Sequence, residues 1–237
     1  MEEIQLEPQP AVIKPVLNWV DLCLVVGGIV ILYALLILGT IWLAGTLPNE
    51  KVLIYANGFF TQLSFIALIL SLKKIRKWSW SDLGLRSVSF KKKWSQILQL
   101  YLLTLFINLI YALYLYQHGF TPPSTDVYTK LLGDTTWLTY LLNLLLAVVL
   151  APLVEETLFR GIIYGSLRTY LGKWTAAALS AALFSALHLQ AYGFFPRLVL
   201  GLVLAHLYEQ NRSLFPSMTF HALNNLIALT LLAGLAP

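Results

Sequence analysis

Two adjacent acids and a base interrupt the apolar stretch Leu150-Ala-Pro-Leu-Val-Glu155-Glu156-Thr-Leu-Phe-Arg160. A charged side chain at the centre of a bilayer costs about 2.5–3.5 kcal/mol on insertion scales, so such residues in membrane helices usually serve a function. Two later apolar stretches add His188, His221 and Asn225. We therefore expect a membrane helix bundle that carries a polar site.

The composition of the whole chain agrees with this interpretation. Its 237 residues are 58% hydrophobic and 11% charged, and the mean hydropathy is +0.74. Soluble domains carry about 25% charged residues. The composition therefore excludes an ordinary soluble domain and predicts an all-α, polytopic transmembrane helical bundle, an integral membrane protein that crosses the bilayer several times.

Uncharged runs of roughly 20 residues locate the expected spans. The runs are Leu22–Leu47, Val52–Leu72, Trp94–Gln117, Thr135–Val154, Trp174–Pro196 and Ser213–Pro237. The fourth is expected to continue past its glutamates to about Leu167. Gly193 and Pro196 indicate a turn, which splits the fifth run into spans Thr175–His188 and Phe195–Tyr208. We therefore expect about seven spans, within bounds of about six and eight.

Basic residues predict the orientation of these spans. Eight lysines and arginines lie in segment 73–93, between the second and third spans. The positive-inside rule makes this loop and the N-terminus cytoplasmic. A basic cluster can also bind nucleic acid, but a topology determinant that contacts anionic lipid explains this one better. We expect the lipid bilayer as a partner, and no nucleic acid.

Helical spacing pairs the polar residues. Glu156 and Arg160 are four residues apart, so they share a helix face and are expected to form an ion pair. The pairs Phe184/His188 and His221/Asn225 have the same spacing. Glu155 points about 100° away from Glu156 and has no base on its own helix face. It must therefore find its partner on another helix.

The expected depths bring these residues to one level of the membrane. At about 1.5 Å per residue, Glu155, His188 and Asn225 lie ~20 Å from the basic side and His221 lies ~14 Å from it. A buried carboxylate beside a neutral imidazole could hold and deprotonate a water molecule. A second imidazole and a carboxamide could stabilise the oxyanion that forms when the water attacks a carbonyl. The residues therefore predict peptide hydrolysis inside the membrane.

Other hydrolytic designs fit the sequence less well. An aspartyl protease needs two buried aspartates, and all four aspartates lie at span ends or in loops. The Gly-x-Ser-x-Gly signature of serine hydrolases and the His-Glu-x-x-His signature of zinc proteases do not occur. A split zinc site formed by Glu155, His188 and His221 would have three ligands and an open position, and it stays open as an alternative. The cofactor is therefore either a divalent metal such as zinc or none.

Three motifs carry a resemblance to a known family. Glu155-Glu156-x-x-x-Arg160, Phe184-x-x-x-His188 and His221-x-x-x-Asn225 occur in this order, each on an expected span. They resemble the motifs of the CPBP family of CAAX-type prenyl proteases and of bacteriocin-processing or Abi membrane proteins. The flanking pairs Ala151-Pro152 and Arg160-Gly161 agree with that pattern.

The resemblance implies an intramembrane endopeptidase that acts on a membrane-associated peptide or protein. Glu155 would activate water with His188, and His221 would act with Asn225 on the oxyanion side. Glu156, Arg160 and Phe184 would support these four, and the metal question stays open within the family.

The chain is then expected to comprise a tail (1–18), N-terminal transmembrane helices (19–134) and a catalytic transmembrane domain (135–237). A different class of function, a non-enzymatic scaffold or bacteriocin-immunity protein, would keep the same polar cluster for structure or binding. A transporter is a third class, but it predicts paired repeats, and the sequence has none.

Overall fold

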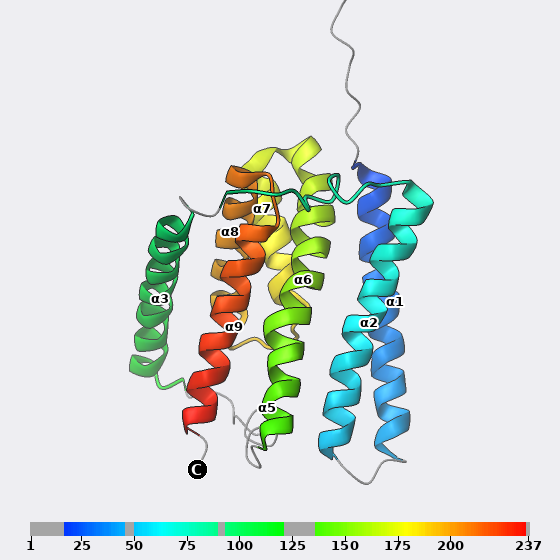
Figure 1. The fold of residues 1–237 in the computed structure, drawn as a ribbon. Helices are drawn as coiled ribbons and strands as arrows, with labels where there is room; N and C mark the ends of the chain where they lie inside the picture. Colours follow the sequence, from blue (N-terminus) through cyan, green and yellow to red (C-terminus); the bar gives the residue numbers. More distant parts are fainter. Residues whose placement is uncertain (1–16, 46–49, 90–92, 121–135, 236–237) are drawn as a thin grey trace, which may run out of the picture.

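The computed structural model describes residues 17–45, 50–89, 93–120 and 136–235, with side chains up to residue 231. Nearly all of the expected tail, 1–18, lies outside these ranges. Every regular element within them is helical, so the predicted all-α class is confirmed. Figure 1 shows the helices running side by side along a common direction, as in a membrane bundle.

Three long helices come from the N-terminal half. They are α1 (Trp19–Ala44), α2 (Glu50–Arg76) and α3 (Trp94–Gln117). A capping box starts α1, in which the Asn18 side chain accepts a hydrogen bond from Val20 N and Asp21 accepts one from Asn18 N. Asp21 is fully buried and also pairs with Arg76 at 2.5 Å. This ion pair joins the start of α1 to the end of α2.

The polar stretch lies in one long helix that changes its winding. Its segments are α5 (Trp137–Asn143), η1 (Leu144–Leu150), α6 (Ala151–Glu156), η2 (Thr157–Tyr164) and α7 (Gly165–Ala186), and η1 and η2 are π-helical. Both glutamates therefore lie in a short α-helical segment between two π-helical ones. Widened turns of this kind are rare and often occur at functional sites.

Gly172 ends the first run of this helix. Its backbone angles (φ 73°, ψ 169°) are not helical, and they divide α7 between the expected fourth and fifth spans. A positive φ of this size costs glycine little, because glycine has no Cβ. The second half of α7 runs back along η2, where Ser180 Oγ donates to Phe159 O at 3.0 Å. This reversal brings Phe184 and His188 towards the glutamates.

Two further helices complete the bundle, α8 (Phe194–Asn211) and α9 (Phe215–Leu235). Figure 1 shows α6–α9 in the centre, the α1–α2 pair on one side and α3 on the other. The described part of the basic loop crosses the end of the bundle where α8 turns into α9. It is held there because Leu214 N donates to Gly84 O at 2.8 Å and Ser213 Oγ donates to Arg86 O at 2.6 Å.

Four helical stretches of the described chain are long and apolar enough to cross a membrane. They are Trp19–Ala44, Glu50–Arg76, Trp94–Gln117 and Trp137–Ala186, and the last one contains the break at Gly172. These stretches support an integral membrane protein. The expected count of about seven spans is not confirmed by them, and it stays a prediction, as does the orientation of the N-terminus.

Gly201 lets α8 approach α7 closely. A Cβ at this position would lie 2.7 Å from Ala181 Cβ and 2.9 Å from Ala181 Cα. Small residues allow this kind of backbone approach in membrane bundles. We expect Gly201→Ala to lower the free energy of unfolding in mixed micelles by about 1–3 kcal/mol, because the two helices must separate.

Gly27 provides the matched control for this substitution. It lies in α1, and a Cβ there would meet nothing within 4 Å. Gly27→Ala should be neutral or stabilising by up to about 1 kcal/mol, since alanine favours a helix interior. Equal stabilities of the two alanine variants would contradict the close packing of α8 on α7.

Candidate active site

The expected ion pair of the first motif is present and fully buried. Arg160 Nη1 donates to Glu156 Oε1 at 2.9 Å, and both side chains are 0% exposed. Arg160 Nη2 also donates to the backbone oxygen of Gly201 on α8, at 3.1 Å. Two charges buried together offset much of the cost that either would have alone. The pair therefore fixes the end of α6 against α8.

His221 connects the two glutamates. Its Nδ1 lies 3.0 Å from Glu156 Oε1, and its Nε2 lies 3.8 Å from Glu155 Oε2. The side chain is 4% exposed. A carboxylate can only accept, so Nδ1 carries the proton in the bond to Glu156 and Nε2 faces Glu155. A chain of polar groups thus runs from Arg160 through Glu156 and His221 to Glu155.

Glu155 has a different environment from Glu156. Its side chain is 18% exposed, and among the described residues its nearest cation-forming contact is His221 at 3.8 Å, which is too long for a hydrogen bond. Glu155 also lies close enough to His188 to interact with it electrostatically. Within the described residues, the carboxylate thus lies next to His221 and within electrostatic range of His188.

His188 lies at the exposed edge of the site, just past the end of α7. Its Nδ1 is 2.8 Å from the backbone oxygen of Phe184, so Nδ1 donates and Nε2 has a free lone pair. The Phe184 ring packs edge-to-face against His188 (centroids 5.0 Å apart) and against His221 (5.8 Å). The Arg160 guanidinium lies over the same ring, 4.8 Å from its centroid. Phe184 thus spaces the two imidazoles from each other.

Asn225 lies one turn beyond His221 on α9, and it bonds to the backbone. Its Nδ2 donates to Ala147 O at 2.8 Å. In η1, Ala151 N–H donates to Leu146 O, and the next residue is Pro152, which has no N–H to donate to Ala147 O. Asn225 therefore satisfies a carbonyl that the proline leaves without its helical donor. The second N–H of the amide is not used in this bond.

Tyr33 of α1 is a residue near the site that the sequence did not indicate. It packs against Phe65 of α2 with ring centroids 5.8 Å apart, and it interacts electrostatically with Glu155. A single tyrosine in an apolar helix has no spacing or motif that would distinguish it from a packing residue. Only the docking of α1 against η2 shows its proximity to the glutamate.

The described residues do not form a three-ligand metal cluster. Within residues 17–45, 50–89, 93–120 and 136–235, no three His, Cys, Asp or Glu side chains gather closely enough to hold an ion. Glu155 and His221 approach each other, but His188 does not complete a set with them. This arrangement does not fit the zinc alternative, and no step below is routed through a metal.

Comparisons with known proteins concern the part of the chain that carries these residues. Residues 137–227 match the family model described as type II CAAX prenyl endopeptidase Rce1-like. The UPF0177 protein YbdI of Lactococcus lactis subsp. lactis (strain IL1403) is 32% identical over 95 residues, which make up 40% of this chain and 49% of that protein. The chain thus matches about half the length of this curated relative. No solved structure matches the chain.

Proposed function

We propose that this chain, which belongs to the CAAX-protease (CPBP) family over residues 137–227, hydrolyses a peptide bond of a membrane-associated peptide or protein. The family supports an intramembrane endopeptidase, and the assignment of roles to residues is ours. The observation that carries it is the position of Glu155, which lies 3.8 Å from His221 Nε2, interacts electrostatically with His188 and, among the described residues, has no lysine or arginine in an ion pair with it.

In the proposed mechanism, Glu155 and His188 hold the attacking water. Glu155 accepts a proton from the water while the water oxygen bonds to the carbonyl carbon of the substrate. The lone pair on His188 Nε2 accepts the second hydrogen bond of the water and orients it. When the C–N bond breaks, Glu155 returns its proton to the leaving amine nitrogen. The new carboxylic acid then releases the remaining water proton to solvent.

The oxyanion is proposed to form on the side of His221 and Asn225. The bond from Nδ1 to Glu156 holds the His221 ring, and its Nε2 lies on the side of Glu155, next to the expected place of the oxyanion. The N–H of Asn225 that is not needed for Ala147 O provides a donor there. Donors that are already oriented in a medium of low dielectric constant stabilise a developing negative charge strongly.

Glu156 and Arg160 act in this proposal as positioning residues. Glu156 accepts from both Arg160 and His221, so it holds the imidazole in one orientation. The bond from Arg160 to Gly201 fixes the same carboxylate relative to α8. Glu156 would thus act like the carboxylates that orient catalytic histidines in other hydrolases.

Reconstituted protein tests the proposal. The purified chain in liposomes should cleave a membrane-anchored peptide library at defined bonds, as detected by mass spectrometry of the products. If Glu155→Ala and His188→Ala variants sustain the biological role of the protein fully, the scaffold or immunity function is correct instead.

We expect His188→Gln to lower kcat by about 10²-fold and to leave KM within about threefold. Glutamine keeps a polar group at the exposed edge of the site but does not provide the imidazole lone pair that orients the water. The measurement is the steady-state rate of peptide cleavage. His118→Gln is the matched control, because His118 lies at the end of α3 and bonds to Tyr114 O of its own helix. A higher KM with an unchanged kcat would contradict the role assigned to His188.

A further inference from the structure

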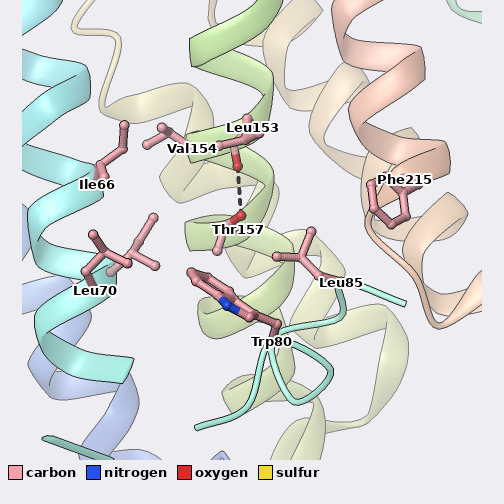
Figure 2. Close-up of a pocket in the computed structure, with 9 residues that line it drawn as sticks. Ile66, Leu70, Trp80, Leu85, Leu153, Val154, Thr157 and Phe215 are labelled. Carbon is pink, nitrogen blue, oxygen red and sulfur yellow. Dashed lines mark hydrogen bonds between the residues drawn. The ribbon is translucent and has the colours of Figure 1, made fainter. Parts of the chain in front are cut away.

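An apolar pocket of about 340 Å³ lies between α2 and α6. Figure 2 shows its walls, with Ile66 and Leu70 of α2 facing Leu153 and Val154 of α6. Trp80 and Leu85 of the basic loop close one end of it, and Phe215 at the start of α9 lies at its far side. Its volume is in the range of small-molecule sites, about 300–1,000 Å³.

Apart from the indole N–H of Trp80 at one end, the lining of this pocket offers almost nothing to a polar ligand. Thr157 is its one hydroxyl-bearing residue, and its Oγ1 donates to Leu153 O within the helix at 2.7 Å. The dashed line in Figure 2 marks this bond. The remaining lining side chains are aliphatic or aromatic. The part of a ligand that enters the pocket must therefore be apolar.

The end of the pocket at Trp80 is cationic. Lys73 Nζ lies 4.8 Å from the centroid of the Trp80 ring, over its face. The last turn of α2 carries Lys73, Lys74 and Arg76, and Arg76 is engaged by Asp21. The ring that closes the apolar space is thus also the ring over which a lysine ammonium lies. A ligand that fits both features has an apolar chain and an anionic group at one end of it.

The pocket opens at the outer surface of the helix bundle. Its rim residues Leu70 and Leu153 are 48% and 49% exposed, and Trp80 and Phe215 are exposed as well. In a membrane, these side chains border hydrocarbon. Indole rings and lysines are typical of the level where acyl chains meet headgroups. A membrane lipid can therefore enter from the side, with its headgroup at the level of Lys73.

We propose that this pocket binds one anionic phospholipid, with an acyl chain between α2 and α6 and the phosphate beside Lys73 and Trp80. The lipid links α2 to the helix that carries Glu155, because Leu153 and Val154 form one wall of the pocket. The proposal does not depend on the proposed peptidase activity.

Lipid binding to the delipidated full-length protein tests this proposal, with native mass spectrometry to count bound molecules. We expect one phosphatidylglycerol to bind at least fivefold more tightly than phosphatidylcholine. Lys73→Gln should weaken the binding of phosphatidylglycerol about fivefold, which is the effect of one basic residue at an anionic headgroup. The same substitution should leave the binding of phosphatidylcholine unchanged. Lys74→Gln is the control for general surface charge, since Lys74 points about 100° away from Lys73 around α2.

Filling the pocket is the second arm of the test. Leu70→Trp and Leu153→Trp replace exposed rim residues and should each remove the tightly bound phosphatidylglycerol. Leu63→Trp adds the same bulk to an exposed position of α2 that does not line the pocket, and it should retain the lipid. Thermal midpoints that match the unsubstituted protein establish that the variants are folded.

Two results would overturn the proposal. One is equal binding of both phospholipids in several copies, unaffected by Lys73→Gln or by the tryptophans, which would indicate unspecific lipid around the bundle. The other is unchanged phosphatidylglycerol binding in the filled variants, whatever happens to peptide cleavage. If the filled variants also lose peptide cleavage, the pocket is assigned to an apolar part of the substrate.

Discussion

Replacing Glu155 by Gln is expected to slow peptide cleavage by about 10²–10⁴-fold, the contribution of a general base. The amide has nearly the shape of the carboxylate but cannot take a proton from water. Single-turnover cleavage of a membrane-anchored peptide measures the effect on the chemical step. The variant should remain folded, because Glu155 is 18% exposed and its contact with His221 Nε2 is 3.8 Å long.

Glu50→Gln is the control for this experiment. Glu50 lies in the first turn of α2, away from the polar cluster, and its neutralisation should leave the rate unchanged. The thermal midpoint of Glu155→Gln in detergent should lie within a few degrees of that of the unsubstituted protein. Cleavage at the original rate by a folded Glu155→Gln variant would end the assignment of Glu155 as the base.

The largest effect on stability is expected for Arg160→Met, which should lower the free energy of unfolding by about 3–5 kcal/mol. The substitution leaves Glu156 charged and fully buried without its cation, and within the described part of the chain Glu156 Oε2 already has no hydrogen-bond partner. It also removes the bond to Gly201 O and the guanidinium from the face of Phe184. Unfolding in mixed micelles measures the change.

Arg168→Met is the matched control for that experiment. Arg168 is 34% exposed and pairs with Glu209, which retains Arg212 at 3.0 Å when Arg168 is lost. We expect Arg168→Met to lower the free energy of unfolding by at most about 1 kcal/mol, as for exposed ion pairs. The double substitution Glu156→Leu/Arg160→Met should recover most of the stability, since it leaves neither buried charge unpaired. It should not recover activity, because the Nδ1–H of His221 loses Glu156 as its acceptor. Equal losses for Arg160→Met and Arg168→Met would contradict the role of burial.

Helical spacing was sufficient to predict much of the candidate site. Residues four apart lie on one face of any helix, so the contact between Glu156 and Arg160 followed from the sequence, and so did the shared face of Phe184 and His188. The depth estimate also brought Glu155 to the level of the motif histidines. Both inferences needed only the period and the rise of a helix, which hardly depend on the rest of the fold.

The partner of each polar atom could not be predicted in this way. His221 was expected to serve the oxyanion with Asn225, but its bond to Glu156 depends on how far α9 is rotated against α6. The bond from Asn225 to Ala147 O depends on the π-helical winding of η1 and on the missing N–H of Pro152. Tyr33 approaches Glu155 only because α1 docks on the central helices. Tertiary packing determines all three.

The number of spans shows a related limit. The apolar runs on either side of residue 172 predicted two spans with a turn between them, and the break at Gly172 lies in that turn. Length and hydropathy together identify four stretches in the described chain. The shorter central helices are partly buried against one another, so they need less apolar surface than a helix surrounded by lipid.

The most direct measurement is an experimental structure of the Glu155→Gln protein with an uncleaved peptide bound. The account predicts one water held between residue 155 and His188, about 3–3.5 Å from the scissile carbonyl carbon. The carbonyl oxygen should point towards His221 and Asn225. A scissile bond outside hydrogen-bonding reach of these groups, or a side chain at 155 turned away from both histidines, would contradict the account.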